Sequence, residues 1–302
     1  MTDWDDMRIF LAVARTESLS GAGRLLRLDP ATVGRRIARL EERLGTRLFA
    51  RSPQGYALSD AGARVLTHAG AAETAMAQIP EALGGPSQGL SGQIRIGAPD
   101  GCANFVLPQV IAAICADNPG LEVQVVALPR VFNLSKREAD MAIAVSAPQA
   151  GRLTVQKITD YHLHLAGARR YLDSHAALTD LQSLQGHRIV GYIPDMIFDR
   201  ELDYLSELGV GAPQLASNSV PVQLQLIAAG AGLGIVHDFA LPFAPGVVRV
   251  LADAIALTRA FYLIRHADDR GVARLNRFAA ALGAGLRREV AQLESAVAAS
   301  DA

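Results

Sequence analysis

Residues 29–45, DPATVGRRIARLEERLG, limit the fold more than any other stretch of this 302-residue chain. Asp29 followed by Pro30 is a strong helix start, because the carboxylate accepts free N–H groups of the first turn and proline suits the first helical position. Gly45 is a typical helix stop. The apolar positions in between fall at helical spacing, at Val33, Ile37, Leu40 and Leu44. The segment therefore predicts a helix with one face packed on a core.

The opposite face of this helix is rich in arginine. Residues 24–51 carry a net charge of +5, whereas the whole chain carries −1, so the basicity is local. Such a face suits solvent, an anionic membrane or a nucleic acid. A membrane surface would favour exposed aromatic residues beside the charges, and the helix contains none.

The neighbouring segments favour a nucleic acid. Apolar residues at helical spacing indicate a helix over roughly residues 4–16, and Ser18 or Ser20 can cap a second one. The tight linkage from that second helix to Asp29 makes a helix-turn-helix, whose second helix enters the major groove of DNA.

The DNA contacts follow from this geometry. We predict that Arg35 and Arg36 read guanine edges and that Thr32 touches a thymine methyl group or a phosphate. RLFAR and YALS, joined by SPQG, predict a two-stranded wing, in which Arg51 contacts phosphate or the minor groove. The complete predicted set is Ser20, Arg24, Thr32, Arg35, Arg36, Arg39 and Arg51.

A long fourth helix is predicted to begin at Ser59 and Asp60. Its apolar positions step by four and three residues, as in a coiled coil: Val65, Ala69, Ala72, Met76, Ile79 and Leu83. The helix either lies on its own domain or pairs with a second chain, and the spacing favours pairing. GGPSQGLSG, residues 84–92, predicts a flexible hinge.

Beyond the hinge, strands alternate with helices. The predicted strands include residues 93–98, 121–128, 140–145, 162–167, 187–192, 233–238 and 261–266, and the predicted helices include one through Phe105 and Ile114 and others near 200–208, 221–230 and 271–290. A short helix with SKRE is expected before residue 140. This alternation predicts parallel α/β sheets in two similar halves with a cleft between them.

The run from Ala31 to Gly62 resembles the N-terminal signature of LysR-type transcriptional regulators. The resemblance rests on ATVGRRIARLEERLG, LFAR, the Leu58-Ser59 pair and Gly62, and it extends over the whole chain. Three positions depart from the common pattern, since Asp29 and Gly34 stand where many members have Ser, and Gly23 where many have Ala. The bases that are read are therefore not transferable.

The resemblance implies the architecture and the assembly. It implies an N-terminal all-α winged helix-turn-helix with a linker helix, and a C-terminal α/β effector domain of two Rossmann-like subdomains of the periplasmic-binding-protein type. The expected domains are residues 1–58 for DNA binding, 59–91 for the linker helix and hinge, and 92–302 for effector binding. Lobe one takes about 92–161 and 267–290, and lobe two about 162–266. The expected assembly is a dimer through the linker helix and a homotetramer overall.

The resemblance also implies that a small-molecule effector binds between the two lobes, at strand ends and helix N-termini. The candidate residues are Asp100, Gly101, Cys102, Arg130, Ser146, Tyr192, Ser217, Ser219 and His237. Each also suits a packing or capping role. Relatives that bind carboxylates often have Ser or Thr near Asp100, so an ionised Asp100 argues against a simple anionic effector.

Four details complete this prediction. Asp100 otherwise serves only as a helix cap, and Arg130 either offsets a ligand charge or pairs with Asp100. His237 is expected to titrate near neutrality. Cys102 and Cys115 are expected about 20 Å apart on one helix, which excludes a disulfide, and Cys102 is expected to be a buried structural thiol.

The sequence lacks the usual motifs of an enzyme. The seven histidines show no ligand spacing, and AGAGLGI (229–235) resembles a dinucleotide loop but follows a helix instead of a strand. We therefore expect no metal, no cofactor and no catalytic residue. The alternative is an α/β enzyme with a basic helical accessory domain.

The expected function is sequence-specific transcription regulation controlled by a small molecule. The partners would be double-stranded DNA, an unidentified effector and further copies of the chain. The acidic N-terminus does not resemble a secretion signal, no apolar run reaches the ~18 residues that cross a bilayer, and two cysteines suit a reducing compartment. We therefore expect a cytoplasmic protein that makes no membrane contact.

Overall fold

A computed structural model describes residues 3–52, 55–77, 79, 89–127, 139–148 and 151–301. These residues form two compact units, 3–79 and 89–301, each with its own hydrophobic core. No helix within these ranges combines the length and the apolar character that crossing a bilayer requires.

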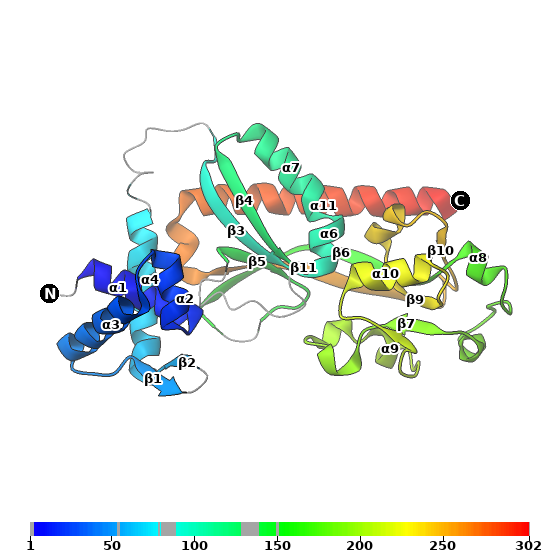
Figure 1. The fold of residues 1–302 in the computed structure, drawn as a ribbon. Coiled ribbons are helices and arrows are strands. Elements are labelled where there is room, and N and C mark those ends of the chain that lie inside the picture. Colours follow the sequence, from blue (N-terminus) through cyan, green and yellow to red (C-terminus); the bar gives the residue numbers. More distant parts are fainter. Residues whose placement is uncertain are drawn as a thin grey trace. The chain divides into compact units, whose positions relative to one another are not determined.

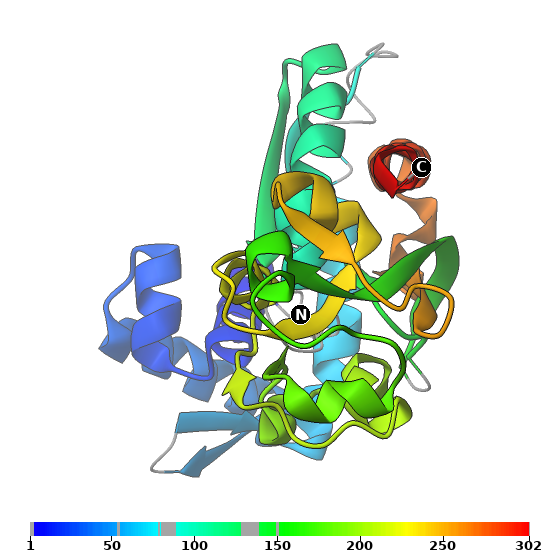
Figure 2. The same cartoon turned by 90° about the vertical axis from the view of Figure 1, so that its right-hand side faces the viewer.

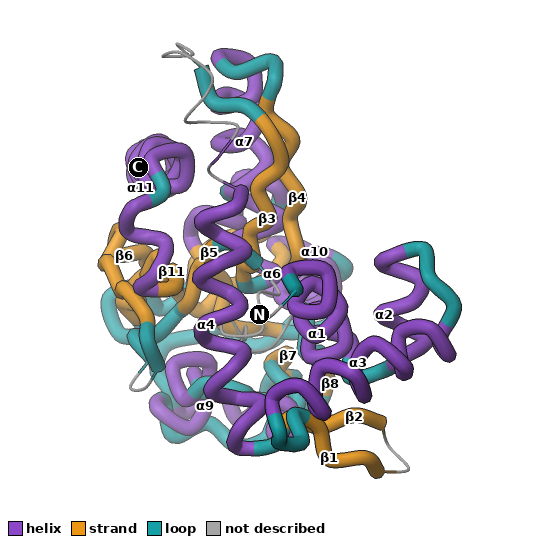
Figure 3. The backbone as a smooth tube through the Cα atoms, turned by 90° about the vertical axis from the view of Figure 1, so that its left-hand side faces the viewer, coloured by secondary structure: helices purple, strands orange, loops and turns teal. Residues whose placement is uncertain are grey.

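The first unit contains the three short helices, the hairpin and the linker helix that the sequence predicts (Figure 3). Their bounds are α1 Trp4–Thr16, α2 Leu19–Leu26, α3 Pro30–Leu44, β1 Phe49–Ser52, β2 Gly55–Leu58 and α4 Asp60–Ala77. Asp29 caps α3 by accepting the Thr32 N–H at 2.9 Å, and Gly45 ends it with φ +63°. Of the two candidate caps for α2, Ser18 is the one used.

The apolar stripe of α3 lies in the core of this unit. Val33, Ile37 and Leu40 are buried there beside Phe10 of α1. Leu44, the last member of the predicted stripe, is 37% exposed. Three of the four stripe residues therefore pack on the core and determine which face of α3 is buried.

The start of α4 explains the Leu58-Ser59 pair and Gly62. The Ser59 hydroxyl donates to the Arg47 carbonyl at 2.7 Å and accepts the Gly62 N–H at 3.0 Å. A Cβ added to Gly62 would lie 2.0 Å from the Leu48 carbonyl oxygen, so only glycine lets the helix pass this close to the chain that enters the wing.

The predicted seam of α4 divides into two parts. Ala69 is buried in the core of its own unit, and Val65 packs against that core. Met76 and Ile79 are 44% and 51% exposed. The first half of the seam therefore lies on its own domain, and the second half is open. Leu83 and residues 84–88 of the predicted hinge lie outside the described residues.

The second unit is built on one curled, mixed sheet (Figure 1). The strand order is β4-β3-β5-β11-β6-β9-β7-β8, and β10 pairs with β6. The bounds are β3 Gly92–Ala98, β4 Leu121–Ala127, β5 Met141–Ala144, β6 Leu153–Ala168, β7 Ile189–Gly191, β8 Leu215–Ala216, β9 Leu233–His237, β10 Val247–Arg249 and β11 Ala256–His266.

The prediction of purely parallel sheets is wrong in the middle of this sheet. β3, β4 and β5 are parallel to one another, as are β7, β8 and β9. The long strands β6 and β11 join these two sets and run antiparallel to their neighbours. Each lobe thus keeps a parallel sheet, and two shared antiparallel strands connect the lobes.

Helices cover this sheet at bounds that differ in places from the prediction. They are α6 Asp100–Phe105, α7 Leu107–Asp117, α8 Arg169–Leu172, α9 Tyr204–Glu207, α10 Val220–Ala228 and α11 Ala273–Asp301. The predicted helix is interrupted at Val106, so Cys102 lies on α6 and Cys115 on α7, and not on one helix. Both cysteines are free. α11 continues eleven residues past the predicted end at 290, and Figure 2 views it nearly end-on. The SKRE segment lies outside the described residues.

Candidate DNA interface and effector site

A buried carboxylate organises the basic face of α3. The Asp6 side chain, on α1, is fully buried and receives three guanidinium groups from successive turns of α3. The Arg36 Nη1 atom lies 3.0 Å from Asp6 Oδ1, and the Arg43 Nη1 atom lies 3.3 Å from Asp6 Oδ2. Arg39 donates both from Nε and from Nη2. We call Asp6 and these three arginines the Asp6 cluster.

The cluster sets the charge state of Asp6. Burial alone raises the pKa of this carboxyl, but the hydrogen bonds and positive charges of Arg39 and Arg36 outweigh burial and hold the pKa below its ordinary value. The charged form of Asp6 is therefore favoured in the folded protein.

The cluster also changes the predicted division of labour on α3. Arg36 and Arg39 were expected to point away from the core toward DNA, yet both bind Asp6. The Arg36 side chain is 33% exposed and the Arg39 side chain is 42% exposed, so solvent still reaches both. The expectation of a fully outward arginine face is corrected for these two residues.

The first turn of α3 presents a different group. Asp29 binds both the N–H and the hydroxyl of Thr32, and Arg35 Nη2 donates to Thr32 Oγ1 at 2.9 Å. Arg35 is exposed. Its positive charge contributes to the lowered pKa of nearby Asp29, but it forms no ion pair with a described carboxylate. Arg35 and Thr32 are thus held together at the N-terminal end of the helix.

The remaining predicted DNA contacts lie on α2 and in the wing. Ser20 and Arg24 are exposed on α2. Arg51 lies in β1, paired with Tyr56, and the placement of its side chain is not described. Gly23 has a structural reason, because a Cβ there would meet the Leu28 carbonyl oxygen at 2.5 Å inside the turn.

In the second unit, five of the predicted effector residues line one small cavity between the lobes. Asp100, Gly101 and Cys102 come from lobe one, Tyr192 from lobe two, and His237 from the end of β9. The cavity has a volume of about 20 Å³. The rest of its lining is Pro99, Val145, Tyr161, Phe198, Leu202, Asn218, Val220 and Phe261. We call this cavity the slot.

Asp100 closes the slot by binding the other lobe. Its carboxylate accepts the N–H of Val220, the first residue of α10, with Oδ2 at 3.1 Å, and also the Ser219 hydroxyl. Its predicted capping role therefore serves a helix of the opposite lobe. Burial raises the pKa of Asp100 above its ordinary value, although hydrogen bonds from Ser219, Val220 and Gly101 oppose that shift.

A second hydrogen bond joins the lobes nearby. The Ser146 hydroxyl, just after β5, donates to the carboxylate of Asp199 in lobe two. Ser217 serves the loop before α10, since its hydroxyl accepts the Ser219 N–H at 3.1 Å and its carbonyl accepts Gln223 Nε2 at 2.7 Å. Arg130 lies outside the described residues.

The floor of the slot is aromatic and contains unsatisfied polar atoms. Tyr161 stacks on Phe261 with ring centroids 4.3 Å apart and on His237 at 5.5 Å. Among the described residues, neither the Tyr161 hydroxyl nor His237 Nδ1 has a hydrogen-bond partner. Burial lowers the pKa of His237 to about 3, so the expectation that it titrates near neutrality is wrong.

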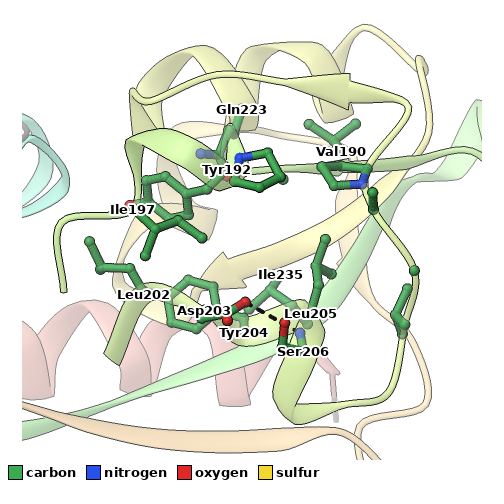
Figure 4. A pocket seen from close by; sticks show the side chains of 16 residues that line it. Val190, Tyr192, Ile197, Leu202, Asp203, Tyr204, Leu205, Ser206, Gln223 and Ile235 are labelled. Atoms are coloured by element: carbon green, nitrogen blue, oxygen red, sulfur yellow. Dashed lines mark hydrogen bonds between the residues drawn. The ribbon is translucent and has the colours of Figure 1, made fainter. Parts of the chain in front are cut away.

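A larger cavity of about 230 Å³ lies within lobe two, and Tyr192 is among the residues that line it (Figure 4). Figure 4 shows Val190, Ile197, Leu205 and Ile235 around it and the hydrogen bond from Ser206 to Asp203. Tyr192 and Leu202 belong to both this cavity and the slot.

Comparison with known proteins identifies the family. Residues 4–63 match the family model of the bacterial regulatory helix-turn-helix protein, lysR family, and residues 87–287 match that of the LysR substrate binding domain. The chain is a LysR-type transcriptional regulator. It carries a helix-turn-helix DNA-binding domain and an effector-binding domain, and its named relatives are transcriptional regulators and not enzymes.

Named relatives of this regulator cover most of its length. A probable hydrogen peroxide-inducible genes activator of Mycobacterium avium is 30% identical over 253 residues, which is 78% of each chain. The HTH-type transcriptional activator TtdR of Escherichia coli (strain K12) is 26% identical over 250 residues, 79% of this chain and 78% of TtdR.

Solved structures share the fold. ArgP from Mycobacterium tuberculosis has a TM-score of 0.72 at 17% identity and covers 95% of this chain and 98% of its own. Full-length OxyR C199D from Pseudomonas aeruginosa has a TM-score of 0.70 at 16% identity, with 95% of both chains covered.

Sequence reasoning missed two kinds of site residue. Asp6 stands on a different helix from its arginines, and nothing in helical spacing connects them. Tyr161 was missed because β6 was expected to start at residue 162 and in fact starts at Leu153. Phe261 lay in a predicted strand, at 261–266, but nothing in the sequence pairs that strand with β6. The alternation of side chains along a longer strand would have placed Tyr161 on the buried face.

Proposed function

We propose that this regulator reads DNA with the first turn of α3 and binds its effector in the slot between the lobes. Arg35 and Thr32 contact base edges, whereas Arg36 and Arg39 contact phosphates while they remain paired with Asp6. The observation that carries the assignment is the Asp6 cluster, because it occupies the other arginines of α3 and leaves Arg35 outside.

The remaining DNA contacts are of the positioning kind. Ser20 and Arg24 of α2 and Arg51 of the wing bind the sugar-phosphate backbone, which gives affinity and a steep dependence on salt without reading sequence. The exposure of Ser20 and Arg24 supports this role.

The regulator works as a dimer through α4 and as a tetramer overall. Met76 and Ile79 support the dimer, since they continue the seam of α4 and are exposed in the single chain. Two recognition helices held by paired α4 helices would bind an interrupted dyad. Because its DNA target is chromosomal, the protein acts in the cytoplasm.

Peroxide sensing, which the name of the Mycobacterium avium relative suggests, finds little support in Cys102. A thiol reacts with peroxide as its thiolate. The Cys102 thiol is 1% exposed, and burial raises its pKa, which disfavours the thiolate. Control by a reversibly bound molecule fits the slot better.

Substitution of Arg35 tests the DNA assignment. We expect Arg35→Ala to weaken binding to the operator by about 1–3 kcal/mol and to relax the preference at one base pair. Arg35→Lys keeps the charge but loses the bidentate geometry, so it should keep the salt dependence and lose the discrimination. Binding of both variants is measured by electrophoretic mobility shift on a footprinted operator. Operator binding by Arg35→Ala equal to wild type would reject the assignment.

A further inference from the structure

The slot and the lobe-two cavity share a wall, and together they fit one class of molecule. We propose that the effector is a small primary amine, whose ammonium group lies against Asp100 in the slot and whose apolar tail lies in the cavity behind Tyr192. This inference rests on the proposed binding of an effector between the lobes and names its chemistry.

The charge of the slot favours a cation. Asp100 is the charged residue of the slot lining, and it has no arginine or lysine partner within the described ranges. Arg259, which lies 5.8 Å from the Tyr204 ring, is paired with Glu201 and Glu207. The N-terminus of α10 supplies only about half a positive charge. Because a half-buried carboxylate has lost part of its hydration, an opposite charge beside Asp100 would be stabilising, and we infer that the slot takes one positive group.

The hydrogen-bonding groups of the slot match an ammonium. An ammonium group has three N–H donors and no acceptor. The slot lining contains the Asp100 carboxylate, which already accepts hydrogen bonds from Val220, Ser219 and Gly101. It also contains the Tyr161 hydroxyl oxygen and His237 Nδ1, two buried atoms without a partner among the described residues. His237 is neutral, so one of its ring nitrogens accepts. The slot lining therefore contains as many candidate acceptors as an ammonium group has donors.

The shape and the walls of the slot agree with this match. A volume of about 20 Å³ holds about one water molecule, and an ammonium group is of similar size. Tyr161, Tyr192, Phe198 and Phe261 line it, and aromatic faces attract cations. A carboxylate effector would instead meet the charge of Asp100 at close range.

The second cavity suits an apolar tail. Its wall is largely aliphatic. Of its polar side chains, Asp203 accepts the Ser206 N–H and Gln223 donates to the Ser217 carbonyl, whereas the Tyr204 hydroxyl has no partner among the described residues. Tyr192 lines both this cavity and the slot, and we infer that its ring moves aside when a ligand binds. One molecule with a cationic head and an apolar tail then fills both.

Calorimetric titration of the full-length protein with three molecules of equal tail tests the proposal. The probes are 2-phenylethylamine, 2-phenylethanol and 3-phenylpropionate. We expect the amine to bind at least about tenfold more tightly than the alcohol and the carboxylate. Tighter or equal binding of either of those two, or no binding of the amine, overturns the proposal.

Three variants locate the two ends of the ligand. Asp100→Asn should weaken amine binding about tenfold, whereas Asp195→Asn, which changes an exposed carboxylate of lobe two that lines neither the slot nor the cavity, should not. Gly211→Leu fills the cavity, because a Cβ at Gly211 meets no atom within 4 Å. It should weaken binding of 2-phenylethylamine and leave that of methylamine unchanged. Amine binding that is unchanged in Asp100→Asn refutes the head-group assignment.

Mobility shift on the same preparations separates the two proposals. If 2-phenylethylamine does not bind while operator binding and its dependence on Arg35 persist, only the proposed class of effector is wrong. If the amine binds through Asp100 and no operator is recognised, the DNA assignment fails and the ligand assignment stands.

Discussion

Asp6 is a buried carboxylate and Asp100 a half-buried one, and the charges around them differ. Asp6 in the DNA-binding unit is surrounded by Arg36, Arg39 and Arg43, which lower its pKa. Asp100 in the effector domain has helix N–H and hydroxyl donors but no described cation, and its pKa is raised. The first carboxylate is paired with cations, and the second has no cationic partner among the residues that the structure describes.

The largest expected effect concerns His237. If this imidazole were charged, Asp100 would have a cationic neighbour and would no longer differ from Asp6 in this respect. Because its pKa is about 3 in the folded protein and 6.5 ordinarily, the unfolded chain alone binds a proton between these values. Stability of the effector domain should therefore fall by about 4 kcal/mol as the pH falls from 6.5 to 3. Calorimetric unfolding across this range measures the loss, which should be smaller in His237→Asn.

The opposite outcome would be clear by magnetic resonance. An imidazole resonance that disappears in His237→Asn and titrates between pH 6 and 7 would give Asp100 a cationic neighbour. The distinction between the two carboxylates would then fail.

The second effect tests the pairing of Asp6 with cations. Asp6→Asn leaves three guanidinium groups facing one another, so we expect the first unit to lose about 2 kcal/mol, less than for a fully buried pair because the arginines are half-exposed. Trp4, the one tryptophan of the chain, lies on α1 and reports unfolding of this unit by fluorescence. Asp5→Asn, an exposed position on the same helix, is the control and should change stability by less than about 0.5 kcal/mol.

The smallest effect is expected at Asp100. Asp100→Asn can still accept the Val220 N–H and leaves no described cation unpaired, so stability should change by less than about 1 kcal/mol in calorimetric unfolding. A loss of more than about 2 kcal/mol would mean that Asp100 is paired with a cation after all, and the two carboxylates would be alike.

The helices of the DNA-binding unit were predictable because their signals are local. Asp29, Pro30 and Gly45 act within one turn of the chain, and each forms the predicted cap or stop. The Asp6 cluster was not predictable. Helical spacing places the arginines on one face of α3, but it does not show which residue of α1 lies opposite that face. Periodicity gives the faces of a helix and leaves the partner of each face unknown.

The effector domain shows the same limit on a larger scale. Alternating strands and helices indicated α/β lobes, and the family confirmed that reading. The directions of β6 and β11 were missed, because an apolar run reads the same in either direction. Five predicted residues meet in the slot because helix starts and strand ends gather at one edge of a parallel sheet, whereas Tyr161 comes from the middle of a strand.

The connection between the lobes has a mechanical consequence. β6 and β11 run through both lobes as paired strands, so the lobes are joined by a hydrogen-bonded ribbon and not by a loop. The register of that ribbon shifts at Phe261 and Tyr262, beside the ring that Tyr161 stacks on. A ribbon bends most easily where its ladder is interrupted. If the lobes move relative to each other at this irregularity, the proposed effector site lies next to the place where the ribbon bends, and a ligand against these rings would change the angle between the lobes.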